Sequence, residues 1–129
     1  MSRILIIDDN QSISDPCQRF LKKKGYEVEI VATKTEAKSI FSLKEFDLVI
    51  IDYTVGFDMG ENFVEMIKKE YPDIGVIVMS GYFSSEGRKQ SMESGAYHCV
   101  DKPFELNKVN DIVTEYFRNY RKQKSSGVN

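Results

Sequence analysis

The sequence predicts an α/β protein with a doubly wound, five-stranded parallel sheet and five helices. Three observations lead to this fold class: five short apolar segments punctuate the chain, segments with helical spacing lie between them, and three of the apolar segments are nearly continuous in Ile, Leu and Val. A strand covered by helices on both faces needs such a continuous run, whereas a half-exposed strand alternates. Strands and helices in alternation require right-handed crossovers and build an open parallel sheet.

The predicted strands are short and spread along the whole chain. They cover residues 4–7, 28–31, 48–51 and 76–79, with a weaker fifth strand around Cys99 and Val100. Between and after them, apolar residues recur three and four positions apart, which predicts amphipathic helices. The apolar positions of the five helices are, in chain order, Ile13, Cys17, Phe20 and Leu21; Ala37, Ile40 and Phe41; Phe63, Met66 and Ile67; Met92; and Val109, Ile112, Val113, Tyr116, Phe117 and Tyr120.

Proline and glycine refine the boundaries of these elements. Gly25 predicts the end of the first helix. Pro16 would clash with the carbonyl four residues back if that helix were already running, so we expect it to start late, with Ser14 or Asp15 as its cap and residues 10–13 as a loop. Gly56 predicts an unusually flexible loop over residues 55–60.

Size and charge narrow the classes of function. At 129 residues the chain fits one compact domain, which we place at residues 1–120, with a polar C-terminal tail or linker stub at 121–129. A formal net charge of −2 argues against a surface that binds nucleic acid, because such domains usually carry a basic excess.

The cysteines and the hydropathy pattern predict a cytoplasmic protein. Cys17 and Cys99 have no metal-ligand spacing and make no disulfide framework, so we expect both thiols to be reduced. The apolar run at residues 4–7 is too short for a signal peptide, and no stretch approaches the ~20 apolar residues of a membrane span. We therefore expect no membrane association.

Three carboxylates follow directly on two of the predicted strands. Asp8 and Asp9 come after the first strand and Asp52 after the third. In doubly wound sheets ligands bind outside the carboxyl ends of the strands, where the strand order reverses, so we expect these side chains to converge. Crowded carboxylates repel one another unless a cation offsets them, and Mg²⁺ is the cation that prefers hard oxygen ligands of this kind.

Two further strand ends carry groups that can bind a phosphoryl oxygen. Ser80 closes the fourth strand and offers a hydroxyl donor, whereas Lys102 follows the fifth strand and offers a flexible positive charge. Each residue alone is commonplace in a turn or on a surface. It is the combination at one edge of the sheet that predicts phosphate chemistry.

The spacing of these residues resembles that of the receiver domains of response regulators. The resemblance spans residues 1 to about 120, and its residues are Asp8-Asp9, Asp52, Ser80 and Lys102-Pro103-Phe104, with GYEV at 25–28 and GA at 95–96 also in the usual places. It implies a flavodoxin-like or CheY-like three-layer sandwich with strand order 2-1-3-4-5. It also implies a stand-alone phosphoacceptor switch in two-component signalling or a phosphorelay, rather than an enzyme that acts on other molecules.

The resemblance implies a role for each residue of the site. Asp52 would accept the phosphoryl group of a phosphohistidine, and Lys102 and Ser80 would bind its oxygens. Mg²⁺ would be held by Asp9, Asp52 and the backbone carbonyl of Thr54, with Asp8 acting through a water. The peptide bond between Lys102 and Pro103 would be cis, which orients the lysine inward.

The residue that would couple the site to the partner-binding surface departs from the family pattern. In receivers, movement of the residue at position 80 is coupled to an aromatic side chain on the fifth strand, and here that position is Cys99. Tyr97 lies on the same face if the strand is regular, and Tyr82 is a second candidate. The third possibility is that Cys99 only fills the core and no aromatic residue switches.

The expected partners follow from the resemblance, and other classes of function stay open. We expect a sensor histidine kinase or histidine phosphotransfer protein, a downstream protein that binds the face formed by the fourth helix, fifth strand and fifth helix, and a monomer or weak dimer. The alternatives are a pseudo-receiver that works without phosphorylation and a receiver cut from a longer regulator. An aspartate-nucleophile phosphatase usually needs an acidic residue at position 54, which is threonine, and a flavin-binding loop would not begin with two carboxylates.

Overall fold

The computed structural model describes residues 2–81, 84–102 and 105–127, with side chains described up to residue 120. Its elements in chain order are β1 (Arg3–Ile7), α1 (Gln11–Lys23), β2 (Glu27–Val31), α2 (Lys34–Phe41), β3 (Leu48–Asp52), α3 (Tyr53–Phe57), the 3-10 helix η1 (Asp58–Gly60), α4 (Phe63–Glu70), β4 (Gly75–Ser80), α5 (Ser85–Glu93), β5 (His98–Asp101) and α6 (Leu106–Gly127). In this part of the chain, no helix is long and apolar enough to cross a lipid bilayer.

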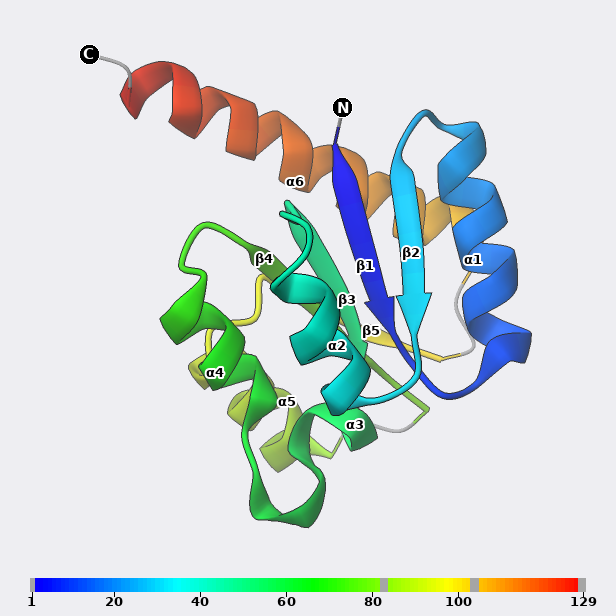
Figure 1. Cartoon of the computed structure of the whole chain (residues 1–129), viewed down its shortest axis with the longest axis vertical. Coiled ribbons are helices and arrows are strands. Elements are labelled where there is room, and N and C mark those ends of the chain that lie inside the picture. Colours follow the sequence, from blue (N-terminus) through cyan, green and yellow to red (C-terminus); the bar gives the residue numbers. More distant parts are fainter. Residues whose placement is uncertain (1, 82–83, 103–104, 128–129) are drawn as a thin grey trace.

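The five strands form one parallel sheet in the order β2-β1-β3-β4-β5, which confirms the predicted fold class and strand order. Residues at the carboxyl ends of β1 and β3 are direct neighbours, because Ile7 pairs with Ile51. In the same way Asp52 pairs with Met79 of β4, and Ser80 pairs with Asp101 of β5. The strand ends that carry polar residues therefore meet at one edge of the sheet (Figure 1).

The sheet divides the core into two apolar layers. On one face, α2 and α4 pack through Phe41 and Phe63 against the strands. On the other face, α1 and α6 pack through Leu21 and Phe117 (Figure 1). Alternate residues of each central strand enter the two layers, so both faces are buried and the strands are continuous in Ile, Leu and Val.

The prediction that α1 starts late is wrong. Asn10 caps the helix, since its side-chain oxygen accepts a hydrogen bond from the backbone N–H of Ser12, and Pro16 lies inside the helix. The cost of the proline is limited because the carbonyl that loses its partner belongs to Ser12, an exposed residue in the first turn that water can reach. At the other end the prediction is confirmed: Gly25 follows the cap residue with φ of 100°.

The segment after β3 is helical and differs from the flexible loop that was predicted. Tyr53–Phe57 forms α3 and Asp58–Gly60 forms η1, so the described part of the chain has one α-helix more than the five expected. Gly56 is buried in α3, packed against Ile51 and Val64, and does not have a positive φ. The apolar contacts of Gly56 hold α3, whereas η1 ends in left-handed backbone, with φ of 54° at Met59 and 73° at Gly60.

The last helix runs further than its apolar stripe. Val109, Val113, Tyr116 and Phe117 are buried against the sheet, and the helix continues through Gly127, into the segment predicted as a polar tail. Residue 120 is the last one with a described side chain.

Candidate functional site

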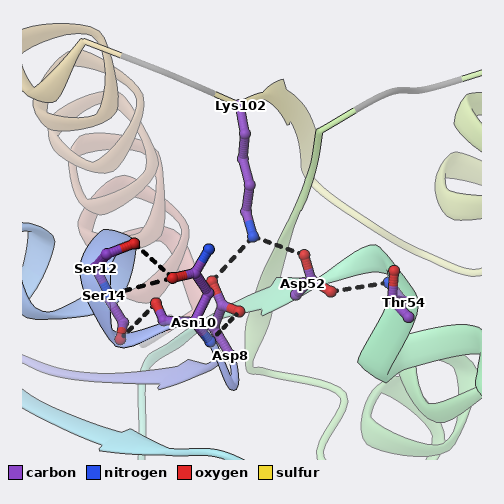
Figure 2. A network of polar contacts seen from close by, with 7 residues as sticks. All are labelled: Asp8, Asn10, Ser12, Ser14, Asp52, Thr54 and Lys102. Atoms are coloured by element: carbon purple, nitrogen blue, oxygen red, sulfur yellow. Dashed lines mark hydrogen bonds and ion pairs between the residues drawn. The ribbon is translucent and has the colours of Figure 1, made fainter.

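The site lies at the carboxyl edge of the sheet, where β1, β3 and β5 end. Figure 2 shows Asp8 and Asp52 directed at the ammonium group of Lys102, which reaches down from the end of β5. Lys102 Nζ is 3.0 Å from Asp8 Oδ2 and 2.7 Å from Asp52 Oδ1. Three residues from distant parts of the sequence therefore form one charged cluster, as their strand-end positions predicted.

The cluster is shielded from solvent, and its lysine keeps its positive charge. The side chains of Lys102, Asp8 and Asp52 are only 9%, 0% and 12% exposed. Burial lowers the pKa of Lys102, but hydrogen bonds and attraction from Asp52 and Asp8 outweigh it, so the pKa lies above its ordinary value. Lysine is therefore charged at neutral pH and compensates one of the two negative charges.

Each carboxylate also accepts a hydrogen bond from the backbone N–H of the residue two positions further along the chain. Asp8 Oδ1 accepts from the N–H of Asn10 at 3.0 Å, and Asp52 Oδ2 accepts from the N–H of Thr54 at 3.1 Å. Asn10 in turn holds Ser12 and Ser14 of the first turn of α1 (Figure 2). Because both oxygens of each carboxylate are held, the two acids have fixed orientations.

Ser80 lies at the same edge and is buried at the end of β4. Its backbone carbonyl accepts a hydrogen bond from the backbone N–H of Lys102 at 2.6 Å. This bond extends the pairing of β4 with β5 by one residue and fixes the point from which the lysine side chain starts.

Asp9 does not join the cluster. It is exposed, unlike Asp8. Among the residues that the structure describes, no group of three His, Cys, Asp or Glu side chains is gathered closely enough to hold a metal ion. Two buried carboxylates with an exposed third beside them still provide the hard oxygens that Mg²⁺ takes, since this ion commonly uses one or two carboxylates and keeps several waters.

The structure separates the two residues considered for an aromatic switch on β5. Cys99 packs in the layer beneath α5, whereas Tyr97 packs in the opposite layer with Tyr116. The expectation that they share a face is wrong, because β5 begins at His98 and strand alternation does not extend back to Tyr97. Tyr97 Oη instead donates to Glu115 of α6 at 3.2 Å.

Two other predicted features lie outside the described residues. These are the candidate switch residue Tyr82 and the cis peptide bond between Lys102 and Pro103.

Three residues near the site were not predicted to have a role in it: Asn10, Tyr53 and Gln90. Asn10 could have been found, because Asn is a favoured N-cap and follows the strand-end acids directly. Tyr53 Oη donates to Gln90 Oε1 at 2.7 Å and joins the segment after Asp52 to α5. No sequence signal marks a contact between a half-buried and an exposed side chain that are 37 positions apart.

The site and fold match known proteins. A family model described as the response regulator receiver domain matches residues 4–114. A putative NtrX-like response regulator of Rickettsia conorii is 34% identical over 113 residues, which are 86% of this chain and 24% of that protein. This chain thus spans about a quarter of the length of that relative.

Solved structures agree with the sequence comparison. The crystal structure of a CheY-like receiver domain from Methanospirillum hungatei has a TM-score of 0.88 and 30% identity, over 95% of this chain and 98% of that one. The solution structure of the beryllofluoride-activated NtrC4 receiver domain dimer has a TM-score of 0.84 and 29% identity, over 93% of this chain and 99% of that one.

Proposed function

This chain belongs to the response regulator receiver family of two-component signalling, and on that premise we propose that it is a phosphoacceptor whose nucleophile is Asp52. The observation that carries the proposal is the position of Asp52, which is buried at a strand end between the ammonium group of Lys102 and the backbone N–H of Thr54. The phosphoryl donor would be a phosphohistidine of a sensor histidine kinase or of a histidine phosphotransfer protein.

The proposed transfer is a substitution at phosphorus. An oxygen of the Asp52 carboxylate attacks, the P–N bond to the donor imidazole breaks with its electron pair going to nitrogen, and an acyl phosphate forms. Lys102 stands within 2.7 Å of the carboxylate and compensates charge that develops on the phosphoryl oxygens. Ser80 would donate its hydroxyl to the same oxygens. Water attack on the acyl phosphate in the same site would reset the switch.

Mg²⁺ is the proposed cofactor, and when bound it supplies positive charge beside the transferred phosphoryl group. Asp9, Asp52 and the carbonyl of Thr54 would hold it directly and Asp8 through a water. The donor chemistry fits, since all of these groups are hard oxygens at the edge of the sheet. The positive charge of Lys102 covers only one of the two buried acids, which leaves the site attractive to a cation.

The proposed setting is a phosphorelay in the cytoplasm, the compartment in which the unpaired Cys17 and Cys99 stay reduced. The proposed receiver comprises residues 1–120, with 121–129 as a tail or linker. Its downstream target would be a protein that binds the face of α5, β5 and α6, without direct contact to nucleic acid. The activated NtrC4 receiver is a dimer, so weak dimerisation after phosphorylation is part of the proposal.

The test is exposure of the protein to Mg²⁺ and acetyl phosphate, followed by intact-mass measurement. We expect a gain of one phosphoryl group in the wild type and none in Asp52→Asn. A matched control, Asp111→Asn, changes an exposed carboxylate of α6 and should leave the gain intact. Lys102→Ala should slow the gain roughly 100-fold, the scale seen when a preorganised charge stabiliser is removed.

The same measurement distinguishes the phosphoacceptor from a pseudo-receiver, which would bind partners without phosphorylation. The exposed position of Asp9, outside the cluster of Asp8, Asp52 and Lys102, favours that alternative. A wild type that gains no phosphoryl group at any Mg²⁺ concentration, while circular dichroism shows it folded, would establish the pseudo-receiver. A gain that persists in Asp52→Asn would instead show that another residue is the acceptor.

A further inference from the structure

The segment that follows Asp52 is joined to α5 by two side-chain hydrogen bonds. Tyr53 Oη donates to Gln90 Oε1 at 2.7 Å, and Asn62 Nδ2 donates to Ser94 Oγ at 2.8 Å. Ser94 caps the end of α5, and its hydroxyl donates to the carbonyl of Gln90. The connection therefore reaches α5 at its middle and at its C-terminus.

The ring of Tyr53 also fits closely against the backbone of α5. Position 87 is a buried glycine, and a Cβ atom there would lie 3.3 Å from both Cζ and Oη of Tyr53. Such a separation is tighter than ordinary van der Waals contact, so a side chain at position 87 would press on the ring of Tyr53. Movement of Tyr53 toward α5 must displace the helix, and movement away from it must break the bond to Gln90.

Tyr53 is placed to move when Asp52 is modified. Asp52 is the N-cap of α3, and Tyr53 is the first residue of that helix, between the cap and Thr54. The cap bond runs from the N–H of Thr54 to Asp52 Oδ2, and Lys102 binds Oδ1. Formation of an acyl phosphate on either oxygen removes the carboxylate charge that both donors bind, so the first turn of α3 has to adjust.

The described part of β5 contains no Tyr, Phe or Trp that could connect the site to α5 as Tyr53 does. Cys99 carries a small side chain under α5, and Tyr97 packs in the opposite layer, bonded to Glu115. Tyr53, by contrast, contacts α5 directly and is covalently adjacent to the proposed acceptor.

We propose that Tyr53 is the positioning residue that transmits the state of Asp52 to α5, through its hydrogen bond to Gln90 and its contact with Gly87. The proposal rests on the proposed function, since it takes Asp52 as the site of modification. It assigns the coupling to the residue after the acceptor instead of to an aromatic residue on β5.

The test is amide hydrogen exchange of residues 85–93 with and without Mg²⁺ and beryllofluoride, the reagent that activates the NtrC4 receiver domain. In the wild type we expect beryllofluoride to change the exchange of these amides. Tyr53→Phe, which removes only the hydroxyl, should reduce that change by about 2-fold to 10-fold, the range that the loss of one side-chain hydrogen bond produces. Gln90→Ala should act likewise, and Gln90→Glu, which keeps an acceptor oxygen, should retain the response.

The control is Tyr97→Phe, which removes a hydroxyl that bonds Glu115 and Asn119 but does not touch α5. It should leave the response of α5 unchanged. A merely structural role of Tyr53 would lower the free energy of unfolding without altering the difference that beryllofluoride makes. Intact mass after acetyl phosphate treatment, measured on the same samples, reports on Asp52 separately.

The outcomes separate the two proposals. If the wild type gains a phosphoryl group but α5 does not respond to beryllofluoride, or responds equally in Tyr53→Phe, the role of Tyr53 is refuted and the phosphoacceptor function stands. If the wild type gains no phosphoryl group, the proposed function fails and the role of Tyr53 fails with it.

Discussion

Tyr116 anchors the last helix beneath the sheet, at the edge opposite the charged cluster. Its Oη donates to the carbonyl of Asp47 at 2.8 Å and accepts from the N–H of Gly75 at 2.9 Å. A Cβ atom on residue 75 would lie 2.2 Å from the ring. Because the residue is buried and bonded on two sides, a shift of the ring away from residue 75 would strain these two hydrogen bonds.

Gly75→Ala should therefore destabilise the protein. We expect the free energy of unfolding to fall by about 2 to 3 kcal/mol, the usual cost of overpacking a filled core, measured by urea denaturation. Gly81→Ala is the matched control, since a Cβ there meets nothing within 4 Å. Equal stability of the two variants would mean that the Tyr116 ring shifts at no cost, contrary to this expectation.

The charged residues of the site could be predicted because each directly ends a strand. Asp8 and Lys102 follow the last residues of β1 and β5, and Asp52 is the last residue of β3. Parallel pairing brings those ends to one edge whatever the helices do. Asp9 could not be placed in this way. Successive residues beyond a strand end point in different directions, so one of two adjacent acids is buried and the other exposed.

At the scale of elements, α1 shows a conflict between local preference and packing. Pro16 removes one hydrogen bond from the helix, and that made a late start reasonable on sequence grounds. The structure retains the first turn because Asn10 caps it and because Cys17 and Leu21 bury the face that follows. Tertiary burial and the cap outweigh one missing bond, and neither could be weighed from the sequence alone.

Pro16→Ala should accordingly stabilise the protein. Proline inside a helix is about 3 kcal/mol less favourable than alanine, and part of this is recovered from the unfolded chain, so we expect a gain of roughly 1 to 2 kcal/mol in urea denaturation. Asp15→Ala, at the exposed neighbouring position, should change stability by under about 0.5 kcal/mol. A loss of stability in Pro16→Ala would show that the proline ring packs in a way that alanine cannot replace.

The folded molecule as a whole holds several protons more tightly than the unfolded chain does. Burial raises the pKa of Cys17 from 9.0 to about 11 and that of Tyr116 from 10.0 to about 12. Burial lowers the pKa of Lys102, but Asp52 and Asp8 raise it above its ordinary value. Cys17 and Tyr116 lie in the apolar layer beneath α1 and α6, and Lys102 lies in the charged cluster. The raised pKa values therefore affect the free energy of unfolding of the whole domain.

All three shifts have the same consequence at alkaline pH. Because each folded-state pKa lies above its unfolded value, the stability that these groups contribute is fully present below about pH 9 and is lost as pH rises toward the folded-state values. At 1.36 kcal/mol per pKa unit, the deprotonation of Cys17 and Tyr116 together should lower the free energy of unfolding by about 3.5 kcal/mol between pH 8 and pH 11. Urea denaturation at half-unit steps of pH measures this loss.

The double variant Cys17→Ala with Tyr116→Phe tests whether these two groups cause the loss. It is expected to be less stable than the wild type at pH 8, since it lacks a buried thiol and a hydroxyl bonded to Asp47 and Gly75. Its stability should nevertheless fall less steeply toward pH 11, because the two largest upward pKa shifts are removed and the smaller ones of Lys102, Cys99, Tyr97 and Lys34 remain. If the two proteins lost stability in parallel, Cys17 and Tyr116 would not be the cause of the alkaline loss, and other groups, among them the buried thiol of Cys99 and the lysines as they lose their charge, would have to account for it.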